Sequence, residues 1–314
     1  MAMYKLVSEI IVFVLLISCS TSKKNKIDEY VFKNKKEKTQ YINSYNKSLR
    51  LWKVAYEEAY VATSFGKAHI IISGPKDAKP LLLLHGMDAS STMWFPNSLA
   101  LSKNHRVYAI DFLMEAGKSE FKGNSLTTDE IVNWYNQIFN YYKFKKVDII
   151  GASRGGWIAT LLTIQTNSKI DKLVLLSPAQ TFDGVDQKGK ASSALFLKFF
   201  PSKKKLKKTL DAFSYYPDKI NSVYKYQFYL ANKYSKSNAS FLQMQTFSDD
   251  ELKKITIPVL VLIGDHDVIN SEKSLLRSNE FISNDKTETI KNAGHFLSMD
   301  QSKEVNKIIV DFLN

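Results

Sequence analysis

Continuous apolar runs, separated by longer segments with helical spacing, recur through most of this 314-residue chain. Runs that are apolar at every position are typical of strands buried on both faces, and such strands alternate with helices in parallel sheets. The pattern therefore predicts an α/β fold with a mostly parallel, eight-stranded sheet flanked by helices. The expected strands cover residues 54–63, 69–73, 81–84, 107–110, 147–150, 173–176, 259–263 and 287–290.

One segment breaks this alternation. Residues 180–251 contain many aromatic residues among lysines and no clear strand, which predicts a helical insertion, or cap. Helices are also expected over residues 128–142, 154–165, 273–281 and 302–313. Apolar residues make up 44% of the chain and charged residues 24%, which is enough for one sizeable core. We therefore expect a single domain over residues 51–314 that carries the cap.

The formal net charge of +13 comes mostly from lysines that are scattered in clusters along the chain. Such an excess is compatible with nucleic acid, an anionic membrane surface or an acidic polymer as a partner, as well as with a solvated lysine-rich surface. We favour the solvated surface. The sequence has no zinc-finger spacing and no RNP-like stretch, so we expect no nucleic-acid partner.

Residues 1–18 have the features of a secretory signal peptide. Lys5 supplies a short basic start, and the apolar run over residues 10–17 is too short to span a bilayer as a helix. Cys19 is the only cysteine in the chain, and it directly follows the sequence Leu-Ile-Ser. This order resembles the bacterial lipobox, in which the cysteine receives a diacylglyceryl group and the signal is cut before it.

The lipobox resemblance implies an exported protein held on a bacterial cell membrane through acyl chains on Cys19. The alternative is an ordinary signal peptide followed by an unrelated cysteine. With one cysteine the chain forms no internal disulfide, so packing alone must stabilise an exported fold. Residues 19–50 are rich in lysine, asparagine and serine, and we expect a tether there that leads into an N-terminal arm, either a helix or an extended segment.

Ser153 lies in the sequence Gly-Ala-Ser-Arg-Gly over residues 151–155, which matches the pattern G-x-S-x-G. The pattern alone is moderate evidence, but here a predicted strand precedes it and a predicted helix follows it. A turn between two such elements is too tight for large neighbours and directs the serine oxygen beyond the carboxyl edge of the sheet. This context predicts that Ser153 is a nucleophile, which then needs a base and a group that orients the base.

Six segments resemble the α/β-hydrolase superfamily, in its own order, from about residue 68 to residue 314. They are LLLLHGMD, VYAIDFLMEAGKS, VDIIGASRGGWIA, LVLLSPA, PVLVLIGDHDVI and NAGHF. Within the superfamily the chain looks most like the carboxylesterase-like branch with a helical cap. Serine at position 153 argues against haloalkane dehalogenases and epoxide hydrolases, whose nucleophile is an aspartate. The resemblance implies that the catalytic residues follow one another as serine, acid and histidine.

Two histidines follow Ser153 in the chain, His266 and His295. His295 lies in a loop after the last expected strand, and the acid should follow the preceding strand, in the segment GDHD. We assign the base to His295 and the acid to Asp267, whereas Asp265 lies nearer the strand end and is expected to hold the turn. Taken alone, His295 would be interpreted as a packed or capping loop residue. The combination with a serine and an acid at the expected strand ends favours catalysis.

The resemblance also implies two backbone N–H donors for an oxyanion, one from Arg154 and one from Met87 in the loop after the third strand. Met93 and Trp94 are candidate walls of the substrate pocket. The arginine at 154 departs from the apolar residue or glutamine that is commoner there, and its side chain is expected to add positive charge near the site. Glu115 stands where the family commonly has a glycine.

Together these residues predict a serine hydrolase that cleaves carboxylic esters, or related acyl substrates, in two steps through an acyl-enzyme. A small-molecule ester is therefore the expected partner, and no metal or organic cofactor is implied. Thioesterase, lactonase and aminopeptidase activities stay open, the last disfavoured by the basic cap. The alternative from another class is a non-catalytic surface lipoprotein that uses a hydrolase fold to bind a ligand or partner. Nothing in the sequence specifies an oligomeric state.

Overall fold

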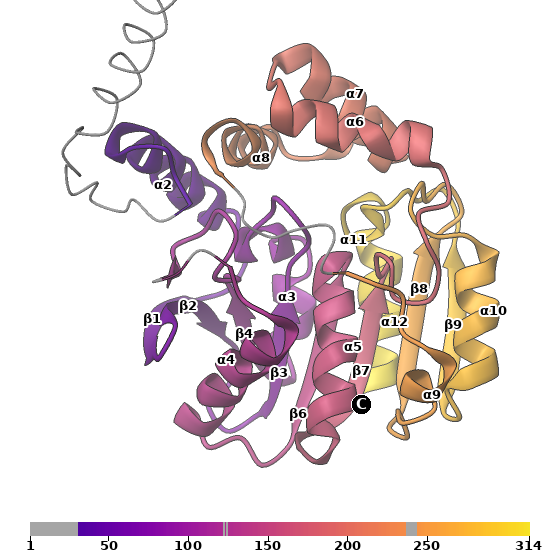
Figure 1. Ribbon diagram of the computed structural model, residues 1–314. Coiled ribbons are helices and arrows are strands. Elements are labelled where there is room, and N and C mark those ends of the chain that lie inside the picture. Colours follow the sequence, from indigo (N-terminus) through magenta and orange to yellow (C-terminus); the bar gives the residue numbers. More distant parts are fainter. Residues whose placement is uncertain (1–30, 122, 124, 237–243) are drawn as a thin grey trace, which may run out of the picture.

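The computed structural model describes residues 31–121, 123, 125–236 and 244–314 (Figure 1). The predicted signal peptide and Cys19 lie outside these residues. Among the described residues, nine strands form one sheet in the order β1-β2-β4-β3-β6-β7-β8-β9, and β5 pairs with β2. The strands are β1 (Tyr56–Thr63), β2 (Gly66–Ser73), β3 (Lys79–Leu84), β4 (His105–Ile110), β5 (Glu120–Phe121), β6 (Val147–Ala152), β7 (Ile170–Leu176), β8 (Val259–Gly264) and β9 (Asp285–Ile290).

The six strands from β4 across to β9 pair in parallel, whereas β1, β2 and β5 are antiparallel at one edge. This arrangement confirms the predicted α/β class and the mostly parallel sheet. Each of the eight expected strands is present. The additional strand, β5, is two residues long, which is too short to leave a pattern in the sequence.

Helices cover both faces of the sheet (Figure 1). The α-helices of the described residues, including those of the cap, are α2 (Lys35–Leu49), α3 (Ser98–Leu101), α4 (Thr128–Tyr141), α5 (Arg154–Thr166), α6 (Lys188–Phe199), α7 (Lys203–Phe213), α8 (Ser222–Tyr234), α9 (Asp249–Leu252), α10 (Glu272–Phe281), α11 (Leu297–Asp300) and α12 (Ser302–Leu313). Neighbouring side chains of a strand point to opposite faces, so Leu82 and Leu84 pack with α4 and α5, whereas Leu81 and Leu83 pack on the face of α3 and α12. A strand such as β3, which is covered on both faces, therefore needs apolar residues at consecutive positions.

The segment before β1 is part of the folded domain rather than a free tether over its described residues. Helix α2 buries Tyr41, Tyr45 and Leu49, and the Tyr41 hydroxyl donates a 2.8 Å hydrogen bond to the Ala116 carbonyl. Of the two forms expected for the arm, a helix or an extended segment, the described residues form a helix, with lysines on its exposed face and the apolar stripe on the buried face.

The region between β7 and β8 contains α6, α7 and α8, which lie over the carboxyl ends of the parallel strands (Figure 1). The expected cap covers residues 180–251, of which residues 237–243 lie outside the described part of the chain. Helix α8 packs against α2, and α6 packs against α7. The cap helices thus close the side of the sheet where ligands of α/β proteins bind. Within the described residues, no helix is both long and apolar enough to cross a bilayer.

Beside the antiparallel edge, a buried histidine bonds to two carboxylates. His69 Nδ1 lies 2.9 Å from Asp111 Oδ2, and its Nε2 lies 2.8 Å from Glu58 Oε2. Burial alone would lower the pKa of His69, but the hydrogen bonds with Asp111 and Glu58 outweigh burial and raise it. The same hydrogen bond to His69, helped by Lys118, lowers the pKa of Glu58 to about 2. The cluster therefore favours a charged, doubly protonated imidazole.

This arrangement predicts a dependence of stability on pH. Because the pKa of His69 is higher in the folded than in the unfolded state, its stabilising contribution is complete below about pH 6.5 and is lost as the pH rises through the raised pKa. We expect a His69→Gln variant to unfold more easily than the parent at low pH and to lose less stability on going from about pH 6 to pH 9. Urea unfolding at each pH measures how the free energy of unfolding of each protein changes with pH. The same change with pH in both proteins would contradict a raised pKa of His69 in the folded state.

Candidate active site

A sharp turn between β6 and α5 presents Ser153. Its backbone has φ of 52°, a left-handed conformation that residues with side chains rarely adopt. The Ser153 N–H donates to the Leu176 carbonyl at 3.0 Å, and its own carbonyl accepts from the Ala179 N–H at 3.1 Å, which fixes the turn to the end of β7. A Cβ at Gly151 would collide with the backbone of Gly155, so glycine is required where strand and helix meet.

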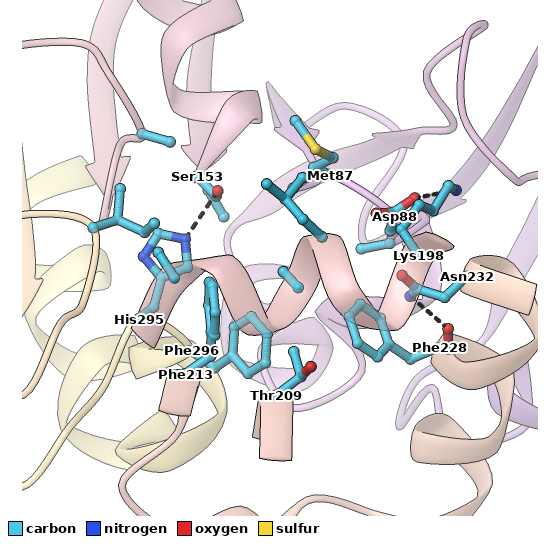
Figure 2. A pocket seen from close by; sticks show the side chains of 18 of the residues that line it. Met87, Asp88, Ser153, Lys198, Thr209, Phe213, Phe228, Asn232, His295 and Phe296 are labelled. Carbon is cyan, nitrogen blue, oxygen red and sulfur yellow. Dashed lines mark hydrogen bonds and ion pairs between the residues drawn. The ribbon is translucent and has the colours of Figure 1, made fainter. Parts of the chain in front are cut away.

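The turn directs the Ser153 hydroxyl toward His295, which lies in the loop after β9. Ser153 Oγ lies 2.9 Å from His295 Nε2 (Figure 2). On the other side of the ring, His295 Nδ1 lies 2.9 Å from Asp267 Oδ1. His295 is in the loop between β9 and α11, and Asp267 is in the loop after β8. The structure thus brings together the serine, acid and histidine assigned from the sequence, although 142 positions separate Ser153 from His295.

The environment of Asp267 keeps it charged. Burial would raise the pKa of this carboxyl, but the His295 ring and two further donors lower it. Those donors are the Ile269 backbone N–H, 2.8 Å from Oδ1, and the Asn270 side-chain amide, 3.1 Å from Oδ2. A charged Asp267 accepts from His295 Nδ1–H, which leaves Nε2 free to accept a proton from Ser153.

Asp265, the other acid of the GDHD segment, bonds to the backbone of the His295 loop and not to the His295 ring. Asp265 accepts hydrogen bonds from the Asn292 and Ala293 backbone N–H groups at 3.0 and 3.1 Å, so it holds the loop that leads to His295. Its neighbour His266 is exposed and bonds to Asp265 at 2.7 Å rather than to Ser153. This geometry agrees with the choice of Asp267 over Asp265 as the partner of His295.

Two backbone N–H groups near Ser153 have no acceptor. Within the described residues, neither the Met87 nor the Arg154 N–H donates a hydrogen bond. Arg154 begins α5, where the first N–H groups of a helix lack partners within the helix. The loop that carries Met87 touches the serine, because a Cβ at Gly86 would lie 3.2 Å from Ser153 Cβ. Free donors beside a nucleophile are what an oxyanion requires.

His85 fixes this loop. Burial lowers its pKa to about 4, so the ring is neutral. Its Nδ1 then donates to the Gly86 carbonyl at 2.8 Å, and its Nε2 accepts from the Phe112 N–H at 2.9 Å. These two bonds orient the loop of Met87 without placing the imidazole against Ser153.

A cavity of about 1010 Å³ lies between the sheet edge and the cap, and Ser153 and His295 are in its wall (Figure 2). Its apolar lining comes largely from the cap, including Leu210, Phe213 and Phe228. Met93 lines the cavity as expected, but Trp94 does not. Trp94 is completely buried in the core beside α2 and α3, because the short 3₁₀ helix that carries both residues (Ser91–Trp94) points them in different directions.

The Arg154 side chain differs from its expected role. It is buried, forms an ion pair with Glu115, and its guanidinium lies 4.9 Å from the centre of the Phe112 ring. Its charge is therefore compensated instead of adding positive charge to the site. Arg154 and Glu115 were both expected to depart from the residues commoner in the superfamily, and the structure shows that these two side chains accommodate each other.

Removing one partner of this buried pair should be costly. We expect Glu115→Gln to lower the free energy of unfolding by about 3–5 kcal/mol, because it leaves a buried guanidinium without its counter-charge. The double variant Glu115→Leu with Arg154→Met removes both charges and should recover most of that loss. Urea unfolding measures each value, and equal losses in the single and double variants would contradict the pairing.

Two contacts near the site have no signal in the sequence. Asp300, in α11, accepts from the Gly294 and Tyr215 N–H groups, both at 2.8 Å, and so ties the His295 loop to the end of α7. Lys198, in α6, lies 2.6 Å from Asp88 Oδ1 and ties the cap to the loop of Met87 (Figure 2). Both join segments that only the fold brings together. No group of residues in the described part of the chain is arranged to hold a metal ion.

A profile of the family described as alpha/beta hydrolase fold matches residues 79–302, which is more than half of the chain. The chain belongs to the α/β-hydrolase family. Among its relatives, the uncharacterized carboxylesterase nap of Bacillus subtilis is 33% identical over 88% of this chain and 92% of its own length. Carboxylesterase YbfK of the same organism is 29% identical over 87% of this chain and 93% of its own.

Comparison with solved structures also finds carboxylesterases of the same fold as this α/β hydrolase. The crystal structure of naproxen esterase (carboxylesterase NP) from Bacillus subtilis superposes with a TM-score of 0.83 at 33% identity, covering 88% of this chain and 98% of that one. The structure of carboxylesterase CesB (YbfK) gives a TM-score of 0.82 at 28% identity, covering 88% and 98%. The resemblance inferred from the six sequence segments is thereby confirmed at the level of family and fold.

Proposed function

We propose that this protein is a serine hydrolase that cleaves carboxylic esters. The single observation that carries the proposal is the continuous hydrogen-bonded series from Ser153 through His295 to Asp267, which opens into a large apolar cavity. The family and the carboxylesterase relatives support the same reaction class. A serine hydroxyl becomes a nucleophile when a neutral imidazole accepts its proton, and the charged Asp267 favours the tautomer that does so.

The reaction proceeds in two steps. Ser153 Oγ attacks the ester carbonyl while His295 Nε2 takes its proton, and the free N–H groups of Met87 and Arg154 donate to the oxyanion. The tetrahedral intermediate collapses, His295 returns the proton to the leaving alcohol, and an acyl group remains on Ser153. Water then attacks the acyl-enzyme with His295 again as the base, which releases the acid and restores the serine.

The cavity favours an apolar substrate. Its wall is mostly carbon from the cap and the sheet edge, and its volume exceeds what a short-chain ester would fill. We therefore infer esters with a bulky or long apolar group. Initial rates on aryl esters of increasing acyl length should rise with chain length up to the limit of the cavity.

Labelling with a fluorophosphonate tests the reaction class directly, because the reagent bonds covalently only to an activated serine. One equivalent should react, and peptide mass spectrometry should place it on Ser153. Well-folded protein that does not react would instead indicate a hydrolase fold used for binding a ligand or partner.

We further propose that the mature protein is exported and held on a bacterial cell membrane by acyl chains on Cys19. The sequence of residues 1–19 supports this proposal. In a bacterial host, Cys19→Ser should abolish incorporation of a labelled fatty acid, whereas the parent should carry it. Incorporation that survives in the Cys19→Ser variant would reject Cys19 as the site.

A further inference from the structure

The end of α6 exposes a group of large apolar side chains on the outside of the cap. Phe199 and Phe200 are 70% and 63% exposed, and Phe196 and Leu195 are 54% and 48% exposed. We call these four residues the α6 apolar patch. Large apolar side chains grouped in this way, on a surface rimmed by charges, mark a site of interaction rather than an ordinary solvated surface.

The segment that carries the patch is rich in lysine. Residues 188–236 contain twelve lysines and two aspartates, so this segment has a net charge of +10 out of the +13 of the whole chain. Lys203, Lys204 and Lys208 are exposed and form no ion pair with any described residue. Lys205 lies over the Phe200 ring, 4.6 Å from its centre. Cationic and apolar groups therefore share one face of the cap.

The patch continues into the cavity. Leu195 and Phe199 both line the cavity as well as the outer surface, and Lys198 between them turns inward to Asp88 (Figure 2). A single helix face thus joins the apolar surface to the space above Ser153.

The N-terminal segment joins the domain on the same side. The first described residues pair with the end of α8: Phe32 forms a bridge with Ser235, and the Lys236 N–H donates to the Val31 carbonyl at 2.6 Å. Helix α2 then packs along α8 (Figure 1). Val31, the first described residue, therefore lies beside the cap helices and not at the opposite end of the sheet.

From these observations we propose that the cap face formed by the α6 apolar patch and its lysines docks on an anionic phospholipid bilayer. Phenylalanine and leucine enter the interface between headgroups and acyl chains, while lysines bind the lipid phosphates. This docking turns the cavity mouth toward the bilayer, so that an apolar molecule dissolved in lipid enters without crossing water. The proposal concerns the surface and does not depend on the reaction at Ser153.

The charge of the face distinguishes a bilayer from a second copy of the chain. Two copies that met through this face would bring two strongly positive surfaces together, which is unfavourable. A bilayer that contains phosphatidylglycerol offers both an apolar interior and the opposite charge.

Site-specific fluorescence on the full chain tests the proposal. In a Cys19→Ser background, the Phe199→Cys variant carries the only cysteine and accepts an environment-sensitive nitrobenzoxadiazole label. Tyr141→Cys is the matched control, because Tyr141 is also an exposed aromatic residue (61%) but lies near the amino ends of the parallel strands. Both proteins keep residues 1–30, so that segment contributes equally to each.

With vesicles of phosphatidylglycerol and phosphatidylcholine, emission of the label at position 199 should increase several-fold and shift to the blue, and the label at position 141 should not respond. Replacing Lys203 and Lys204 by glutamine should weaken vesicle binding roughly fivefold for each lysine, whereas the same changes at Lys145 and Lys146 should not.

Three results would overturn the proposal. One is an unchanged emission at position 199 when the protein binds vesicles, and another is an equal response at both positions. The third is a response at position 199 without vesicles that increases with protein concentration, which would assign the face to a second copy.

Discussion

Replacing Ser153 by alanine should lower kcat/KM for ester hydrolysis by about 10⁶-fold, or about 8 kcal/mol of transition-state stabilisation. The change removes the nucleophile of the first step, Ser153 Oγ, which lies 2.9 Å from His295 Nε2. The turn itself is held by the backbone hydrogen bonds that residue 153 forms with Leu176 and Ala179, which the substitution leaves in place. The melting temperature should therefore change little. Hydrolysis of a p-nitrophenyl ester measures the rate, and circular dichroism measures the fold.

Ser192→Ala is the matched control for this change. Ser192 lines the same cavity on α6, but its hydroxyl donates to the Gly189 carbonyl at 2.7 Å and has no histidine beside it. Its replacement should leave kcat/KM within a few-fold of the parent. Activity that persists in purified Ser153→Ala at more than about a thousandth of the parent rate would show that another group carries the reaction.

Replacing Asp267 by asparagine should lower kcat by about 10⁴-fold. The asparagine amide can donate to His295 Nδ1 and so favours the tautomer with the proton on Nε2, which cannot accept the Ser153 proton. The Asn270 amide, which donates to Oδ2 in the parent, can still donate to the remaining side-chain oxygen and restrain the side chain, whereas the Ile269 N–H loses its acceptor at the Oδ1 position. The effect should therefore arise mainly from protonation.

Asp265→Asn provides the comparison for this second prediction. Asp265 is two positions away, but its oxygens accept from the Asn292 and Ala293 N–H groups and do not contact His295. Its replacement should reduce stability modestly and change kcat by less than about tenfold, since one amide oxygen can still accept from this loop. The same large loss of kcat in both variants would contradict the assignment of Asp267 alone as the partner of His295.

The strands and the three assigned residues could be predicted because each depends on a local feature at a fixed place in a known order. The continuous apolar runs of β3, β6, β7 and β8 are required by burial on both faces, and parallel strands place all their carboxyl ends at one edge. Ser153, Asp267 and His295 lie just after the carboxyl ends of β6, β8 and β9, so their meeting needs only the topology of the sheet.

Other features could not be predicted, because they depend on which segments pack together. Trp94 was expected beside the substrate with Met93, but the register of one 3₁₀ turn sends its side chain into the core. Arg154 was expected to add charge near the site, but the loop after β4 places Glu115 against it. The sequence left open whether the arm before β1 is a helix or an extended segment, and only the fold shows that α2 packs on the domain.

By itself, the sequence determined the α/β class, the order of the strands along the chain, the family and the three residues assigned to catalysis. Each of these follows from hydropathy over a few residues or from a motif whose backbone geometry permits few side chains. The tertiary structure alone decided that Arg154 pairs with Glu115, that α2 belongs to the domain, and that Leu195 and Phe199 of the α6 apolar patch also line the cavity. These properties are distances between segments far apart in the chain, and no local pattern of residues specifies such distances.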